Sequence, residues 1–172
     1  MDKINAYLAG PVVFQPNAAQ VLGERVQLCR SLGMDATPPA DNGEHAQEGV
    51  ELARAIYAGN LDRMFQCNAV IANISPFRGP NMDPGTAFEI GWFAGKGAPV
   101  VLWSEDPHDL RKRVNDWEGH REHLDREGLL IEDFGLPENL MIALSSPVVH
   151  RSFREAAQWL SEHAGNSHGG CI

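Results

Sequence analysis

The chain has 172 residues, a length that fits one domain with a substantial core. Its 43% apolar and 22% charged residues are ordinary values for a globular protein, and its formal net charge is -9. A chain this acidic, with no basic stripe, is a poor ligand for a phosphate backbone, so we expect no nucleic-acid partner.

Several further classes of protein are disfavoured by the pattern of the residues. No apolar run reaches the length that spans a bilayer, and the N-terminus MDKINAYLAG lacks the apolar core of a signal peptide. Cys29, Cys67 and Cys171 are odd in number and lack CxxC spacing, which favours reduced thiols. The seven histidines show no metal-binding spacing. We therefore expect a cytoplasmic protein with no membrane partner, no metal and no cofactor.

Strands and helices are predicted to alternate along the first hundred residues. Short apolar runs bounded by turn residues predict strands at 4–9, 34–37, 69–74 and 98–103. Apolar residues at helical spacing predict helices at 17–32, 50–66 and 84–95. This alternation predicts the α/β class: a parallel-sheet, doubly wound domain, flavodoxin-like or Rossmann-like, with helices on both faces.

The second part of the chain is more polar. Residues 106–128 are highly charged and are expected to form an exposed excursion, and 129–134 are predicted to add a strand. The apolar run 140–144 is too large to leave exposed on a monomer, so it packs on its own core or on a neighbouring subunit. An amphipathic helix is predicted at 152–163. We expect one domain over 1–164 and a flexible tail over 165–172.

The stretch from 69 to 95 is the best candidate for an active site. A strand with the composition of a doubly buried one leads into a turn-rich loop that contains Arg78, and Asp83 is suited to cap the helix that follows. Glu89 lies in that helix between Phe88 and Ile90. A carboxylate among apolar residues needs partners, because burying an ionised group alone is costly. Glu89 is therefore either a structural, hydrogen-bonded residue or a functional one.

Three further polar residues are candidates for the same pocket. Tyr7 lies in the first strand, where it either packs in the core or donates a hydrogen bond into a site at the end of the sheet. Asn60 is next to the apolar stripe of the helix before the central strand, so its amide could reach the pocket of Glu89. Asp41 lies in a Pro- and Gly-rich loop, where it serves either a ligand or a turn.

Four segments, in chain order, resemble the nucleoside 2-deoxyribosyltransferase family: YLAGP, PPADN, VIANISPFRGPNMDPGTAFEIGWFAGKGAPV and FGLPENLMIA. The resemblance implies an enzyme of nucleotide salvage that transfers a 2-deoxyribosyl group between purine or pyrimidine bases. It also implies a covalent sugar intermediate on a glutamate, and slow hydrolysis when no acceptor base is present. The partners would be small deoxynucleosides and free nucleobases.

The resemblance also implies roles for individual residues. Glu89 matches the nucleophile, Tyr7 the tyrosine that orients it, and Asp83 the aspartate that binds sugar hydroxyls. Asn139 and Met141 match a motif that reaches the site of a neighbouring subunit, which implies a homo-oligomer, a dimer or higher. Further substrate-binding positions in the matched motifs are Gly10, Asp41, Phe77 and Arg78.

One position departs from the family pattern. Asn60 stands where the family usually has an aspartate that donates a proton to the departing base, and an amide does not shuttle protons near neutral pH. Two alternatives to transfer stay open. One is the related hydrolase of 2'-deoxynucleoside 5'-monophosphates, for which Ser75, Arg78, Ser145 and Ser146 are candidate phosphate ligands. The other is a non-catalytic nucleotide-binding domain.

Overall fold

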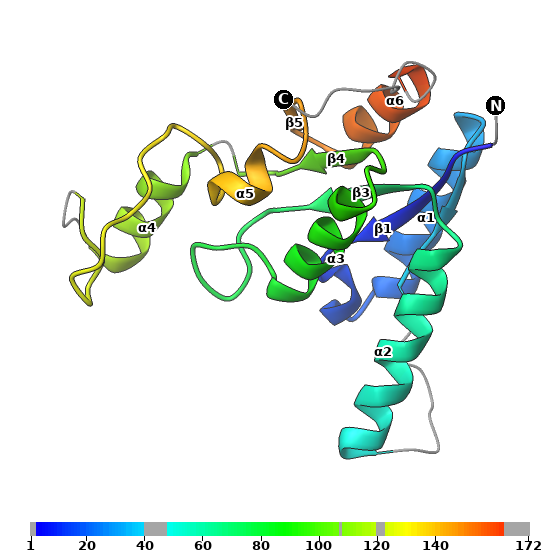
Figure 1. Ribbon diagram of the computed structural model, residues 1–172, viewed down its shortest axis with the longest axis horizontal. Coiled ribbons are helices and arrows are strands. Elements are labelled where there is room, and N and C mark those ends of the chain that lie inside the picture. The colour runs from blue at the N-terminus through cyan, green and yellow to red at the C-terminus, as the bar shows by residue number, and fades with distance from the viewer. Residues whose placement is uncertain (1–2, 40–47, 107, 120–122, 164–172) are drawn as a thin grey trace.

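The structure is a computed structural model that describes residues 3–39, 48–106, 108–119 and 123–163. Within these ranges the chain forms one five-stranded sheet surrounded by helices (Figure 1). The strands are β1 (Asn5–Ala9), β2 (Asp35–Thr37), β3 (Ala69–Asn73), β4 (Val100–Trp103) and β5 (Val149–His150). The helices are the 3-10 helix η1 (Pro11–Phe14), α1 (Ala18–Ser31), α2 (Gly49–Phe65), α3 (Pro84–Gly95), α4 (Leu110–Glu118), α5 (Leu140–Ala143) and α6 (Phe153–His163).

All neighbouring strands of the sheet are parallel, in the order β2-β1-β3-β4-β5. The chain first builds outward from β1 to β2, then returns to β3 on the other side of β1 and continues outward to β5. This is a doubly wound sheet whose winding reverses between β1 and β3. The predicted fold class is confirmed. Each strand and helix predicted in the first hundred residues begins and ends within about two residues of the observed one.

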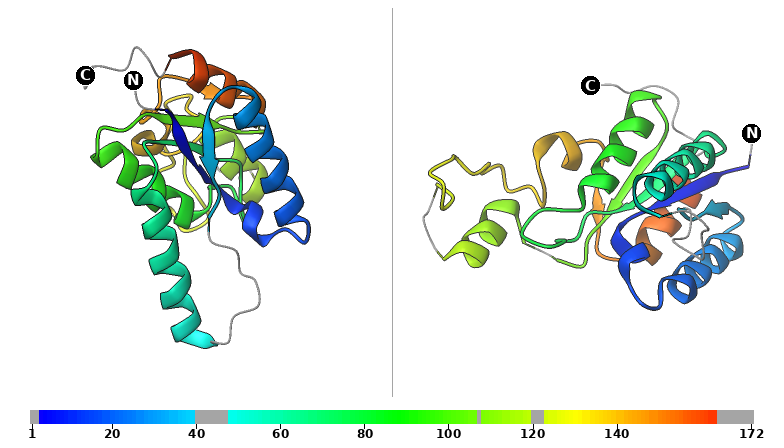
Figure 2. Two further views of the ribbon diagram at one scale, coloured as in Figure 1. Left: turned by 90° about the vertical axis from the view of Figure 1, so that its right-hand side faces the viewer. Right: turned by 90° about the horizontal axis from the view of Figure 1, so that it is seen from below.

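Helices cover both faces of the sheet, because side chains of each buried strand alternate between the two sides (Figure 2). On one face, α1 and α6 pack against Ala6, Leu8, Ile71 and Trp103. On the other face, α2 and α3 pack against Tyr7, Val70, Ala72 and Leu102. Every residue of β3 is buried, as its apolar composition predicts. The alternation also decides that the Tyr7 side chain lies on the α2 and α3 side.

The strand predicted at 129–134 is wrong, and a strand that the sequence does not reveal takes its place. The outer edge of β4 pairs with Val149–His150, so the residues at 129–134 do not extend the sheet beside β4. Their contact of strand type is an isolated bridge between Leu124 and Leu130. Asp125 accepts hydrogen bonds from the backbone N–H groups of Glu127 and Leu129, which supports a turn there.

The end of β1 passes very close to the end of β3. Gly10 follows β1 with φ of 151°, and a Cβ atom added there would lie 2.9 Å from the Cβ of Asn73. No side chain fits at that distance, and the φ value is itself one that L-residues rarely adopt. Gly10 therefore allows the chain to turn sharply into η1 beside the central strand.

Gly10→Ala should destabilise the fold by about 1–3 kcal/mol, because it adds both backbone strain and a steric overlap. Guanidinium denaturation measures the change in the free energy of unfolding. The matched control is Gly23→Ala in α1, where a Cβ meets no atom within 4 Å. That control should be neutral or stabilising by up to about 1 kcal/mol. Equal stability of Gly10→Ala and the wild type would contradict the close approach.

Candidate active site

A hydrogen bond between Tyr7 and Glu89 joins the first strand to the central helix. The Tyr7 hydroxyl donates to Oε1 of Glu89 at 2.8 Å, across 82 positions of sequence. Tyr7 is completely buried, and its ring stacks on Phe93 of α3 at a centroid distance of 6.0 Å. The two residues that the sequence analysis paired as nucleophile and orienting group are therefore brought together.

Burial and the neighbouring charges shift the proton equilibrium of this pair. Burial raises the pKa of Glu89 from its ordinary 4.5 to about 7, the hydrogen bond from Tyr7 opposes that rise, and the charge of Asp83 adds to it. Burial, with the charge of Glu89, raises the pKa of Tyr7 far above its ordinary value. Near neutral pH the phenol therefore keeps its proton and donates, while Glu89 is poised between its neutral and ionised forms.

Asp83 lies at the N-terminus of α3, where it caps the helix as its position predicts. Its Oδ2 atom accepts from the backbone N–H and from the hydroxyl of Thr86, both at 2.8 Å. The cap fixes the start of the helix that carries Glu89 one and a half turns later. The electrostatic effect of Asp83 on Glu89 indicates that the two carboxylates lie near each other.

The loop after β3 folds back on η1 beside Gly10. Phe14 and Phe77 stack with ring centroids 5.2 Å apart, and the guanidinium of Arg78 lies 4.7 Å from the Phe77 centroid and 5.1 Å from that of Phe14. Arg78 has a positive φ of 54°, which is unusual for a residue other than glycine. The structure thus groups Phe77 and Arg78 with Phe14, which the sequence analysis did not select and which ends the 3-10 helix that follows Gly10.

Asn60 lies half-buried on α2. One turn before it, the ring of Tyr57 packs against Phe88, the neighbour of Glu89, at a centroid distance of 6.5 Å. One turn after it, the positive charge of Arg63 acts on the Tyr7 hydroxyl. Arg63 is a second residue near the pair that the sequence analysis missed. In the sequence, the available signal was that Arg63 follows Asn60 by three residues in a predicted helix, which makes the two residues neighbours on its surface.

Asn139 and Met141 lie at the start of α5. Asn139 caps the helix, with Oδ1 accepting from the Met141 N–H at 3.0 Å, and its Nδ2 donates to Glu132 Oε1 at 2.5 Å. Ala143 is buried, whereas Met141 is 75% exposed and Leu144 68% exposed. The apolar run therefore packs only partly on its own core, and two of its large side chains face outward.

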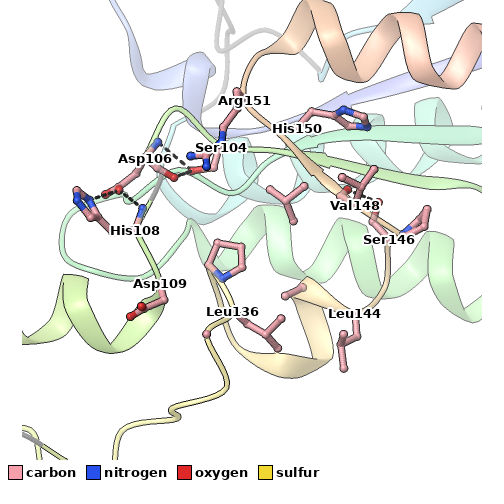
Figure 3. Close-up of a pocket in the computed structure, with 15 residues that line it drawn as sticks. Ser104, Asp106, His108, Asp109, Leu136, Leu144, Ser146, Val148, His150 and Arg151 are labelled. Atoms are coloured by element: carbon pink, nitrogen blue, oxygen red, sulfur yellow. Dashed lines mark hydrogen bonds and ion pairs between the residues drawn. The ribbon is translucent and has the colours of Figure 1, made fainter.

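A cleft of about 320 Å3 lies apart from these residues, beside the end of β4 and the segments that flank α5 (Figure 3). One side is apolar, with Leu136, Leu144 and Val148, and the other carries Asp106 and His108, whose side chains bond to each other at 2.8 Å. Ser146, a candidate phosphate ligand of the sequence analysis, lines it, whereas Tyr7, Glu89, Asp83 and Asn139 do not. We therefore do not place the candidate site in this cleft.

Some expectations of the sequence analysis concern residues outside the described ranges, or features that the structure tests only within those ranges. Asp41 and the predicted tail at 165–172 lie outside the described residues. Within the described ranges, no three His, Cys, Asp or Glu side chains gather closely enough to hold a metal ion. Among the helices of the same ranges, none combines the length and apolar character needed to cross a membrane.

Comparison with known proteins places these observations in a family. Residues 6–141 match the family model described as nucleoside 2-deoxyribosyltransferase. A 2-desoxiribosyltransferase from Leishmania mexicana has a similar structure, with a TM-score of 0.75 and 32% sequence identity over 93% of this chain and 98% of that chain. An uncharacterized protein of Schizosaccharomyces pombe is 31% identical over 156 residues, which are 78% of this chain and 73% of that protein.

A more distant structure shares the fold. The 2-deoxyribosyltransferase from the bacterium Bacillus psychrosaccharolyticus has a TM-score of 0.51 and 23% identity, over 83% of this chain and 96% of that chain. At that identity the likeness concerns the architecture of the sheet and helices.

Glu89→Gln should stabilise the protein at alkaline pH and leave it unchanged in acid. Because folding raises the pKa of Glu89, the stability linked to its proton is fully present below about 4.5 and is lost as pH rises through about 7. A neutral amide avoids that loss, so the free energy of unfolding should rise by roughly 1–3 kcal/mol at pH 8.5.

Denaturant titrations at pH 4.5 and pH 8.5 measure this effect. The control Glu162→Gln changes an exposed carboxylate on α6 and should alter stability by less than about 0.5 kcal/mol at either pH. A pH-independent effect of Glu89→Gln would contradict the raised pKa.

Proposed function

The chain belongs to the nucleoside 2-deoxyribosyltransferase family, and on that premise we propose that it transfers a 2-deoxyribosyl group between the bases of deoxynucleosides through a covalent intermediate on Glu89. Without an acceptor base, water takes the sugar slowly. The substrates are small deoxynucleosides and free nucleobases, which suits a cytoplasmic enzyme of nucleotide salvage. The acidic net charge and the absence of CxxC spacing agree with that location.

The observation that carries this proposal is the 2.8 Å hydrogen bond from Tyr7 to Glu89. It holds one oxygen of the carboxylate and leaves the other to attack the anomeric carbon. As the bond from that carbon to the base nitrogen breaks, positive charge develops on the sugar, and a nearby carboxylate stabilises it. The Glu89 oxygen then bonds to the anomeric carbon, and the electron pair of the broken bond leaves with the base.

The second half of the reaction reverses the first. A nitrogen of the incoming base attacks the anomeric carbon, the bond to Glu89 breaks, and the carboxylate is regenerated. Each displacement inverts the anomeric carbon, so the product retains the configuration of the substrate. Hydrolysis follows the same path with water as the nucleophile.

The remaining site residues are proposed to bind the substrate around this centre. Asp83, whose charge acts on Glu89, binds sugar hydroxyls with its carboxylate while it also caps α3. The stacked group of Phe77, Arg78 and Phe14 offers flat surfaces that suit a nucleobase, and Gly10 precedes the 3-10 helix that carries Phe14. Asp41 keeps the substrate-binding role that the family resemblance implies.

Asn60 is proposed to orient the base by hydrogen bonds. An amide neither gains nor loses a proton near neutral pH, so the proton that the departing base requires comes from water or another group. Tyr7 is a poor source, because its pKa is raised far above the ordinary value. This arrangement predicts slower departure of the base than an aspartate at position 60 would give.

A homo-oligomer, a dimer or higher, is supported by apolar side chains that the isolated chain leaves exposed. Tyr57, Phe65 and Phe88 on α2 and α3 are each more than half exposed, as is Met141 on α5. Figure 1 shows α2 extending well beyond the sheet, and Met64 is the one described residue of that helix that is buried. We propose that a second copy covers these surfaces and that Asn139 and Met141 complete its site.

Hydrolysis of deoxynucleoside 5'-monophosphates is the second candidate, and the geometry supports it less. The hydroxyls of Ser145 and Ser146 donate to backbone oxygens of Ile142 and Val148 in their own turns. The Arg78 guanidinium is stacked on two aromatic rings. All three side chains are thus engaged locally, and Ser146 borders the cleft beside β4 without Arg78 or Ser145.

A chromatographic assay with 2'-deoxyinosine and adenine tests the proposed activity. The proposal predicts formation of 2'-deoxyadenosine, and release of hypoxanthine alone would contradict transfer. A reaction only with deoxynucleoside monophosphates would support the hydrolase. Binding of nucleosides, both purine and pyrimidine, without release of base would support the non-catalytic alternative.

Tyr7→Phe should move the acid limb of the pH profile to higher pH. The wild-type kcat/KM should rise with pH through about 7 as Glu89 ionises. Removing the hydrogen bond that lowers the pKa of Glu89 should shift that midpoint upward by about half to one pH unit. Steady-state assays between pH 5 and pH 9 measure the midpoint, and an unchanged or lower value would exclude Tyr7 as the group that stabilises the carboxylate.

Asn60→Asp should raise kcat about tenfold if supply of the proton limits departure of the base, a modest value for general acid catalysis. Single-turnover release of base, followed by rapid quench, reports this step directly. Asn68→Asp, outside the site on the turn before β3, is the matched control and should leave the rate unchanged. A fall in the rate for Asn60→Asp would show that the amide itself is required.

A further inference from the structure

One buried carboxylate joins two parts of the proposed site that are far apart in sequence. Glu138 is 3% exposed. Its Oε2 accepts from the backbone N–H of Met82 at 2.9 Å, 56 residues earlier in the chain, and its Oε1 accepts from the N–H of Asn139 at 3.0 Å. The first bond holds the residue before Asp83, and the second holds Asn139 itself. Both carboxylate oxygens of Glu138 therefore accept hydrogen bonds from backbone N–H groups of proposed substrate-binding segments.

Arg113 of α4 forms an ion pair with Glu138, but only part of its guanidinium is hydrogen-bonded. Its Nη2 lies 3.2 Å from Glu138 Oε2 and also donates to the carbonyl of Pro137. Arg113 is 5% exposed, and its Nε and Nη1 atoms are buried without a hydrogen-bond partner among the described residues. Burying an ion pair costs desolvation that is repaid only when its polar atoms are fully bonded. The pair is thus a poor device for stability alone.

A second carboxylate orients the side chain of Asn139. Glu132 accepts from Asn139 Nδ2 at 2.5 Å and from the backbone N–H of Leu140 at 2.9 Å. Glu138 therefore fixes the backbone of Asn139, and Glu132 fixes its amide. A loop residue held at both points is presented in one orientation, as a binding group should be.

We propose that Glu138 is a positioning residue of the transfer reaction. This inference rests on the function proposed above. The carboxylate of Glu138 sets the distance between the Asp83 end of α3 and the Asn139 end of α5, and the ion pair with Arg113 holds that carboxylate in place. Because Asp83 serves the site of its own subunit and Asn139 that of a neighbour, Glu138 connects a binding element of one site to a binding element of the next.

Two variants separate this role from a purely structural one. Glu138→Asp keeps the charge opposite Arg113 but is one methylene too short to hold both backbone N–H groups. The double variant Glu138→Gln with Arg113→Met removes both charges, so no unpaired cation remains in the interior. The matched control is Glu155→Gln, which weakens another bond from a carboxylate to a backbone N–H, that of Arg151, at the start of α6.

We expect both variants to fold, as judged by circular dichroism and thermal melting, and to raise KM for 2'-deoxyinosine about tenfold while kcat falls less than about threefold. Glu155→Gln should keep the wild-type KM. Either Glu138 variant that folds with KM within twofold of the wild type would overturn the positioning role. If one variant does not fold, the other decides.

A binding measurement separates this inference from the function on which it rests. In a Glu89→Ala background the nucleoside is not consumed, so calorimetry with 2'-deoxyinosine gives a dissociation constant directly. Weaker binding by about tenfold in the Glu138 variants would support the positioning role even if the wild type failed to exchange bases. Unchanged binding would overturn it, whatever the activity of the wild type.

Discussion

The Tyr7 hydroxyl reaches Glu89 because two elements 82 positions apart meet on one face of a parallel sheet. The alternation of side chains along β1 sends Tyr7 toward α3, and the stacking of its ring on Phe93 fixes where the hydroxyl lies. The cap at Asp83 then fixes where α3 begins, and so where Glu89 lies on it. Strand register, helix start and aromatic packing therefore all determine one contact, and the proposed chemistry depends on that contact.

Two buried carboxylates of this protein have opposite environments and serve opposite needs. Glu138 accepts hydrogen bonds from a guanidinium and from two backbone N–H groups, which hold both of its oxygens in place. Glu89 has a neutral hydroxyl as its hydrogen-bond donor and a second carboxylate nearby, so burial raises its pKa to about 7. A carboxylate that is weakly stabilised when charged is the better nucleophile, because it has more to gain from bonding to a cationic sugar. The protein thus holds one carboxylate firmly and keeps the other reactive.

The sequence was sufficient for most of the fold and for the central pair, but for different reasons. The strands and helices up to Trp103 follow from local patterns, since the doubly buried β3 and the capped α3 each carry a strong signal. The pairing of Tyr7 with Glu89 came from the family resemblance, because no local pattern reveals a contact across 82 positions. The structure shows the hydrogen bond between the two side chains, and their catalytic roles are proposals.

What the sequence missed depends on tertiary context. β5 has only two residues, too few for a periodic pattern, and it occupies the edge of β4 in place of the strand predicted at 129–134. No local pattern in the sequence marks Phe14, Arg63 or Glu138 as a residue of the site. Each is recognised only through its interaction with a residue elsewhere in the chain: Phe77, Tyr7 and Met82 respectively.

The central claim is that Glu89 bonds covalently to the sugar, and mass spectrometry of protein quenched in acid during turnover with 2'-deoxyinosine tests it most directly. We predict a gain in mass of one 2-deoxyribosyl group, located on the peptide that contains Glu89 and absent from Glu89→Ala. Base exchange with no such adduct, or with the adduct on another residue, would contradict the account.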